Sequence, residues 1–143
     1  YPGSQFTIPF GRGALRREGD DIVVLTWGAL VQRSLLAAQQ AEKEGISAAV
    51  FDLRSIIPYD WTGIASLVKR LNRVVIVHED QLTCGFGAEI AARIGSELFE
   101  YLDAPLARVA ALDSPVAYSP DLEEVILPQS ADVLEAIRTT ANY

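Results

Sequence analysis

The chain has 143 residues, of which half are hydrophobic and 22% are charged, a composition typical of a single globular domain. Its net charge of −7 excludes the clustered basic surface that nucleic-acid binding requires, and no apolar run approaches the length of a membrane span. One cysteine and one histidine cannot form a disulfide framework or a common zinc site.

The chain begins with an irregular segment, residues 1–10, that contains two prolines and a glycine and no methionine. We interpret it as a linker or arm from an upstream domain, and the whole chain as a fragment of a larger protein. Residues 14–18 form a short charged run typical of an edge strand. Residues 22–26 are β-branched and apolar, which indicates a buried strand that ends before Gly28.

Strands and helices then alternate. A helix is predicted from Leu30 to the glycine at position 45, a strand over 48–53, a helix capped by Asp60, and a strand over 74–77. A further helix over 88–101, a strand over 106–110, a proline-containing excursion over 113–128 and a terminal helix complete the pattern. Alternation of this kind predicts a mostly parallel sheet with helices on both faces, in which ligands gather at the carboxyl ends of the strands.

A glycine-rich turn, Thr83 to Gly87, follows the strand over 74–77 and opens the next helix. Such a turn can hold a phosphate on main-chain N–H groups, but Gly85 and Gly87 lack the dinucleotide-binding spacing and their neighbours are acidic. Close packing of the helix start against the sheet is the alternative.

The residues next to this turn leave several functions open. His78 could transfer a proton with Glu79 as its partner, could lie at an interface or beside a ligand, or could be an ordinary buried histidine. Adjacent strand residues point to opposite faces, which argues against a simple dyad. Cys84 has no complete set of catalytic partners. Trp27 could anchor an interface or pack in the core, as could Phe86. No catalytic residue, no cofactor-binding residue and no metal ligand is assigned.

Five segments together resemble a known family. They are T-W-G at 26–28, V-F-D-L-R-S-I-I-P-Y-D at 50–60, V-H-E at 77–79, G-F-G-A-E-I at 85–90 and D-S-P-V-A-Y at 113–118. In order and spacing they resemble the C-terminal domain of the beta subunit of thiamin diphosphate-dependent 2-oxo acid dehydrogenases, which has a transketolase C-terminal-like fold. The resemblance implies such a domain over residues 11–143. It also implies a three-layer α/β/α sandwich with a five-stranded, mostly parallel sheet whose first strand is antiparallel.

The resemblance also implies a function for the parent enzyme. Such enzymes decarboxylate a 2-oxo acid on thiamin diphosphate and magnesium and transfer the acyl group to a lipoyl group. The cofactors bind to the alpha subunit and the upstream beta domain, so this domain alone is expected to be inactive. Its expected partners are a second beta subunit, the alpha subunit and the lipoyl acyltransferase component, with no nucleic acid or membrane.

Finer expectations follow from the same likeness. The H-E pair before T-C-G-F resembles branched-chain 2-oxo acid enzymes more than pyruvate enzymes, and pyruvate or another 2-oxo acid is the alternative. The expected compartment is the bacterial cytoplasm, or the mitochondrial matrix in a eukaryote. The candidate interface or crevice residues are Trp27, His78, Glu79, Gly85, Phe86 and Gly87. An alternative hypothesis from a different functional class is a stand-alone α/β domain that binds a small anionic ligand.

Overall fold

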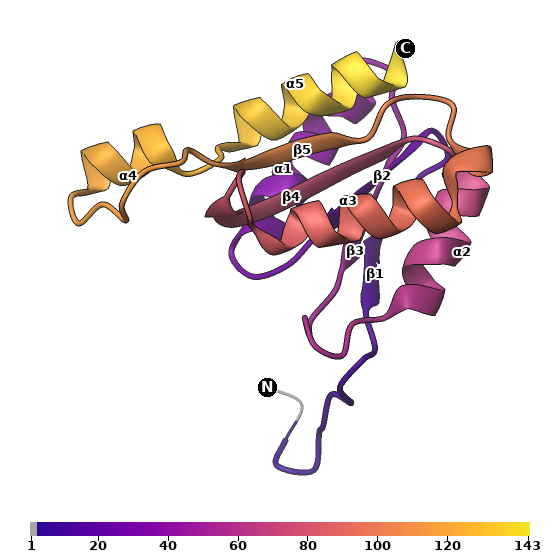
Figure 1. Ribbon diagram of the computed structural model, residues 1–143, viewed down its shortest axis with the longest axis horizontal. Coiled ribbons are helices and arrows are strands. Elements are labelled where there is room, and N and C mark those ends of the chain that lie inside the picture. The colour runs from indigo at the N-terminus through magenta and orange to yellow at the C-terminus, as the bar shows by residue number, and fades with distance from the viewer. Residues whose placement is uncertain (1–2) are drawn as a thin grey trace.

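Five strands form one mixed sheet in the order β1-β3-β2-β4-β5 in the computed structural model, which describes residues 3–143 (Figure 1). The strands are β1 (Ala14–Arg17), β2 (Ile22–Thr26), β3 (Ala48–Asp52), β4 (Val74–Gln81) and β5 (Ala107–Ala111). Only β1 is antiparallel to its neighbour, whereas β2, β3, β4 and β5 run parallel. The predicted mostly parallel sheet with an antiparallel first strand is confirmed.

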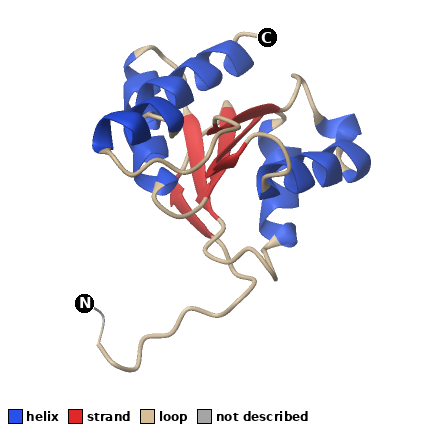
Figure 2. Ribbon diagram, turned by 60° about the vertical axis from the view of Figure 1, so that its left-hand side comes forward, coloured by secondary structure: helices blue, strands red, loops and turns tan. Residues whose placement is uncertain are grey.

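Helices cover both faces of this sheet, so the molecule has three layers (Figure 2). Helices α1 (Leu30–Lys43) and α5 (Ser130–Ala141) pack on one face, and α2 (Trp61–Leu71) and α3 (Phe86–Glu97) pack on the other. A short 3₁₀ turn, η1 (Phe99–Tyr101), follows α3, and a small helix, α4 (Pro120–Ile126), projects from the body of the sandwich (Figure 1). The predicted α/β/α sandwich is therefore confirmed.

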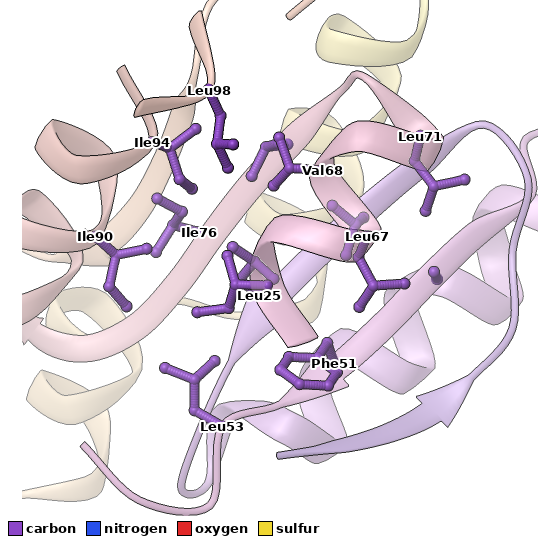
Figure 3. Close-up of a cluster of buried hydrophobic side chains, with 14 residues drawn as sticks. Leu25, Phe51, Leu53, Leu67, Val68, Leu71, Ile76, Ile90, Ile94 and Leu98 are labelled. Carbon is purple, nitrogen blue, oxygen red and sulfur yellow. The ribbon is translucent and has the colours of Figure 1, made fainter. Parts of the chain in front are cut away.

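The larger of the two cores lies between the sheet and the α2–α3 layer. Leucine, isoleucine and valine side chains from both helices meet Leu25, Phe51 and Ile76 of the strands (Figure 3). The opposite core is built with smaller residues, because alanines of α1 lie against valines of the sheet. Every residue of β2 is buried, as expected for a central parallel strand covered on both faces.

Several element boundaries differ from the predictions, and one helix was not predicted. β4 continues to Gln81, four residues beyond the predicted end, because its pairing with β5 resumes there. The helix predicted over 88–101 begins at Phe86 and stops at Glu97, before η1. The excursion over 113–128 contains α4, which was not predicted. Ser119 caps that helix, and Pro120 occupies its first turn. Proline is tolerated there because an N–H group in the first turn has no partner within the helix.

The first described residues, 3–13, run away from the sandwich as an extended segment (Figure 1). This segment joins the domain at two hydrogen bonds. The N–H of Gly11 donates to Ser55 Oγ at 2.8 Å, and the N–H of Gly13 donates to Asp60 Oδ2 at 3.0 Å. The predicted linker covers residues 1–10, of which 1 and 2 lie outside the described residues, so its connection to an upstream domain stays a prediction.

Candidate functional site at the carboxyl edge of the sheet

The sheet has its switch point between β2 and β4. The chain passes from β2 to β3 on one side and later returns to β4 on the other side, so the carboxyl ends of β2 and β4 lie next to each other. In open α/β sheets a ligand crevice forms at such a point. Trp27 follows β2 directly, and His78 lies in the terminal half of β4.

Aromatic side chains fill this point of the sheet. The rings of Trp27 and His78 are stacked with centroids 5.3 Å apart and planes 1° from parallel. Three further pairs of rings meet edge-on. The ring centroids are 6.0 Å apart for Phe86 and Trp27, 5.6 Å for Phe86 and Tyr59, and 6.3 Å for Tyr59 and Trp61. These five rings are called the aromatic cluster below. Edge-to-face and offset contacts of this kind stabilise packed rings beyond the area they bury.

Arg93 of α3 closes the outer end of the aromatic cluster. Its guanidinium carbon lies 4.0 Å from the centroid of the Trp61 ring, and its Nη1 donates to the Tyr59 hydroxyl at 2.9 Å. Its Nε donates to Glu97 at 2.8 Å. The hydrogen bond to Tyr59 and the one to Glu97 raise the pKa of Arg93 above its ordinary value. The guanidinium therefore stays charged and holds α2 and α3 together.

The glycine-rich turn is shaped by the imidazole of His78. A Cβ on Gly87 would lie 2.2 Å from His78 Nε2, and a Cβ on Gly85 would lie 2.1 Å from the carbonyl oxygen of Gln81 and 2.7 Å from the His78 ring. Only glycine allows the start of α3 to approach the ring this closely. The ring thus packs against the first turn of α3, and this close packing supports the packing alternative over the phosphate cradle.

His78 is a fully buried histidine whose surroundings favour the neutral imidazole. Its side chain is 0% exposed, and within residues 3–143 neither ring nitrogen has a hydrogen-bond partner. Burial lowers the pKa of His78, and the nearby Arg108 lowers it further, whereas Asp80 opposes both. A charged imidazolium would lose its hydration there, and the nearby Asp80 compensates for that loss only in part.

Glu79 points away from this ring. It is exposed, and its carboxylate lies beside Gly28, where a Cβ would meet Oε2 at 3.3 Å. His78 and Glu79 therefore face opposite sides of β4, as the alternation of a strand predicts. Cys84 is exposed on the turn with a φ of 64°, while the imidazole is sealed inside. The structure brings neither residue into a nucleophile–base pair with His78.

Of the residues singled out from the sequence, Trp27, His78 and Phe86 belong to the aromatic cluster. Gly85 and Gly87 pack against its His78 ring, and Glu79 lies outside it. Tyr59, which joins Phe86 to Arg93, was not predicted. Its position directly before the capped start of α2 is the only signal that could have indicated it, because this places the ring over the carboxyl edge of the sheet.

A mixed five-stranded sheet between two helix layers, with an antiparallel edge strand and a filled carboxyl edge, defines an α/β/α domain of the transketolase C-terminal type. Residues 11–133 match the family described as the transketolase C-terminal domain. The chain belongs to this family.

Curated relatives support this assignment over almost the whole chain. Subunit beta-2 of the mitochondrial pyruvate dehydrogenase E1 component of Oryza sativa subsp. japonica is 41% identical over 135 residues, which are 94% of this chain and 36% of the relative. The corresponding beta subunit of Bacillus subtilis is 39% identical over 142 residues, 99% of this chain and 43% of the relative. The chain therefore spans well under half the length of these relatives.

Solved structures show the same fold. A protein titled as a split gene transketolase, inactive beta4 tetramer, superposes with a TM-score of 0.82 at 25% sequence identity. The match covers 98% of this chain and 44% of the solved chain. A transketolase mutant of Pichia stipitis superposes with a TM-score of 0.64 at 18% sequence identity. This match covers 93% of this chain and 18% of the solved chain. The latter likeness concerns the fold alone.

Proposed function

We propose that this chain is the C-terminal domain of the beta subunit of a thiamin diphosphate-dependent 2-oxo acid dehydrogenase, and that it serves assembly rather than chemistry. The observation that carries the proposal is the filled carboxyl edge of the sheet, where Trp27 stacks on a buried His78. A side chain with no exposed surface cannot exchange protons with a substrate without rearrangement. Similarity to pyruvate dehydrogenase beta subunits over nearly the whole chain supports the choice of enzyme class.

The residues present do not fit the diphosphate of the cofactor. The N-terminus of α3 is the place where main-chain N–H groups could receive a phosphate, but the imidazole of His78 lies against it. Glu79, Asp80 and Glu89 add negative charge nearby. Within residues 3–143 no three metal-ligating side chains gather at one point. We therefore propose that thiamin diphosphate and magnesium bind outside this chain, and no catalytic step is assigned to its residues.

Assembly roles follow for the surface of the domain. Dimerisation with a second beta subunit, contact with the alpha subunit and docking of the lipoyl acyltransferase component are the proposed roles. His78 itself is inside the domain, so its contribution to an interface would be indirect, through the shape of the turn over 83–87. The exposed acidic surface of a chain with a net charge of −7 favours partners of opposite charge.

The substrate of the parent enzyme can be proposed for this chain only from sequence similarity. The H-E pair at positions 78 and 79 favours a branched-chain 2-oxo acid, whereas the two curated relatives described above are subunits of pyruvate dehydrogenases. The similarities thus favour pyruvate. We retain the branched-chain acid as the second arm of the substrate test. The proposed compartment is the mitochondrial matrix in a eukaryote and the cytoplasm in a bacterium.

The experiment combines the natural beta chain with its alpha subunit and acyltransferase and follows NADH formation from pyruvate and from 3-methyl-2-oxobutanoate in the presence of dihydrolipoyl dehydrogenase. We expect turnover of one of these acids by the assembled enzyme and none by the 143-residue chain alone. Turnover by the isolated chain would contradict the assembly role. Absence of turnover of any 2-oxo acid by the assembled proteins would contradict the enzyme class.

The alternative class, a domain that binds a small anionic ligand, loses its site in this geometry. The crevice that it requires is filled by the aromatic cluster, and the acidic side chains nearby repel an anion. Calorimetric titration with nucleotides and inorganic phosphate separates the two classes, since an assembly domain gives no binding heat with any of them.

A further inference from the structure

Residues 112–128, here called the projecting arm, leave the sandwich after β5 and return to it before α5 (Figure 1). Several of its apolar side chains face solvent: Val116 is 86% exposed, Tyr118 is 99% exposed and Val125 is 70% exposed. Its helix α4 has no buried residue. The arm therefore presents apolar surface that its own chain does not cover.

The base of the arm is fixed to the carboxyl edge of the sheet. Asp113 accepts hydrogen bonds from the Thr83 N–H at 2.9 Å and from the Thr83 hydroxyl at 2.6 Å. The side-chain amide of Gln81 donates to the carbonyl oxygen of Ser114 at 2.8 Å, and the N–H of Leu112 donates to the carbonyl of Ile126 at 3.1 Å. The exposed apolar side chains thus stand on a well-anchored support, which lowers the entropy cost of binding.

A hollow of about 320 Å³ lies between the arm and the end of β4. Its apolar wall includes Val116, Ile126 and Leu127, and its acidic side chains are Glu79, Asp80 and Glu123. No lysine or arginine lines it. The hollow therefore combines an apolar wall with negative charge.

The charge of the arm has one sign. Residues 112–128 contain four acidic residues, Asp113, Asp121, Glu123 and Glu124, and no basic one. Arg108, on the adjoining strand, donates to the carbonyl oxygen of Leu82. A second copy that packed its own arm on this arm would bring like charges together, which is unfavourable.

We infer that the projecting arm and its hollow dock a basic, apolar segment of a different subunit, with a lysine or arginine of that segment held by Glu79, Asp80 and Glu123. The inference rests on the proposed function, since it assigns a surface to one of the assembly partners. Apolar side chains of the segment cover Val116 and Val125. Complementary charge sets the orientation and speeds association, and burial of the apolar surface supplies the affinity.

The test measures binding of the natural beta chain to two named partners, its alpha subunit and its acyltransferase component, and to itself. The charge variant is Glu123→Lys with Glu124→Lys, and the apolar variant is Val125→Asp. Asp20→Lys with Glu100→Lys makes the same change in net charge at exposed positions outside the arm. Ile57→Asp matches the apolar variant, because Ile57 is 84% exposed and belongs to the loop before α2.

We expect both arm variants to weaken binding of one partner subunit by about tenfold or more, with the two control variants close to wild type. Binding of wild type should also weaken as salt is raised from 50 to 500 mM, and this salt dependence should be smaller in the charge variant. Self-association should be unchanged.

Three results would overturn the inference: unchanged affinity of both arm variants for both partners, equal loss in the controls, or a loss confined to self-association. Circular dichroism of each variant shows whether it is folded, and Val116→Asp repeats the apolar test if Val125→Asp is not. If wild type binds neither partner, the proposed function fails as a whole. If it binds and the arm variants bind equally well, only the docking surface is wrong.

Discussion

The indole of Trp27 and the imidazole of His78 are parallel to within 1°, with ring centroids 5.3 Å apart. Trp27 follows β2 and His78 lies in β4, two strands that are neighbours in the sheet although α1, β3 and α2 separate them in the sequence. This stack joins the carboxyl ends of β2 and β4 and is covered on its other side by the start of α3, where Gly87 contacts the ring. Open α/β sheets commonly hold ligands at this point, but here packed side chains of β2, β4 and α3 fill it.

The buried imidazole makes stability depend on pH. The unfolded chain has the ordinary pKa of 6.5, and the pKa of His78 is lower in the folded protein. Between these two values the unfolded state binds a proton that the folded state does not, so the free energy of unfolding falls as pH drops below 6.5. The fall has an upper limit of about 1.4 kcal/mol per pH unit.

His78→Phe should remove this dependence, because His78 is the single histidine of the chain and phenylalanine keeps the stack. Urea unfolding at half-unit steps from pH 5 to 8 measures it in both proteins. We expect the wild-type midpoint to decline below pH 6.5 and the variant midpoint to stay flatter. Equal slopes in the two proteins would mean that the imidazole titrates normally when folded.

Gly87→Ala should destabilise the domain. The new Cβ would lie 2.2 Å from His78 Nε2, and relief requires movement of α3 or of the stacked rings. Overpacking of this kind costs about 1–3 kcal/mol. Gly95→Ala in the same helix is the matched control, because nothing lies within 4 Å of its Cβ position, and it should stabilise the domain by about 0.5–1 kcal/mol. Thermal unfolding of both variants provides the comparison, and a stabilised Gly87→Ala protein would refute the tight contact.

The alternation of strands and helices could be predicted because each element carries its own periodic signal. β2 shows a fully buried apolar run, and α2 follows a capping aspartate. The direction of β1 is different, since a four-residue strand carries no signal of its direction. The strand was predicted from the charged run over 14–18, but its antiparallel direction was expected only from the family resemblance. The helix α4 was hidden because it lies in a proline-containing stretch and buries none of its residues.

The site could be predicted only in part. The sequence favoured close packing of the turn at Gly85 and Gly87 over a phosphate site, because the glycine spacing differs from the dinucleotide motif and the neighbouring residues are acidic. It could not indicate what the turn packs against, since the partner ring of His78 is set by the register of β4 against β2. Tyr59 was missed for the same reason: its contacts with Phe86 and Arg93 depend on how α2 and α3 lie side by side.

Asp60 links the entry of the chain to the start of α2. Its Oδ1 accepts a hydrogen bond from the N–H of Gly63 at 2.9 Å, and its Oδ2 accepts one from the N–H of Gly13 at 3.0 Å. Asp60→Ala removes both and should cost about 1–2 kcal/mol. Asp60→Asn keeps one acceptor oxygen, which can cap α2 but cannot also bind Gly13, so its cost should be smaller.

Amide hydrogen exchange distinguishes the two bonds of Asp60. In the asparagine variant the N–H of Gly13 should exchange faster while that of Gly63 stays protected, and in the alanine variant both should exchange faster. Protection of Gly13 in both variants would show that the Asp60 side chain does not hold the entry segment.

Thr83 controls the base of the projecting arm through Asp113. The hydroxyl and the N–H of Thr83 both donate to this carboxylate, and these hydrogen bonds lower the pKa of Asp113 below its ordinary value of 3.8. Because the folded pKa is depressed, the contribution of Asp113 to stability is present above pH 3.8 and is lost as pH falls through the folded value. Thr83→Val removes the hydroxyl and keeps the N–H, so the pKa of Asp113 should rise toward 3.8, as measured by carboxyl NMR titration.

The same variant should loosen the arm without unfolding the sheet. Amide exchange should accelerate over residues 112–118 and remain slow in the fully buried strand β2. Thr62→Val is the matched control, because Thr62 is exposed on α2 and lies outside the arm. If Asp113 titrates alike in wild type and Thr83→Val and the arm exchanges at the wild-type rate, the hydroxyl contributes nothing to anchoring. If the arm loosens and partner binding weakens with it, the anchored base is what preorganises the docking surface.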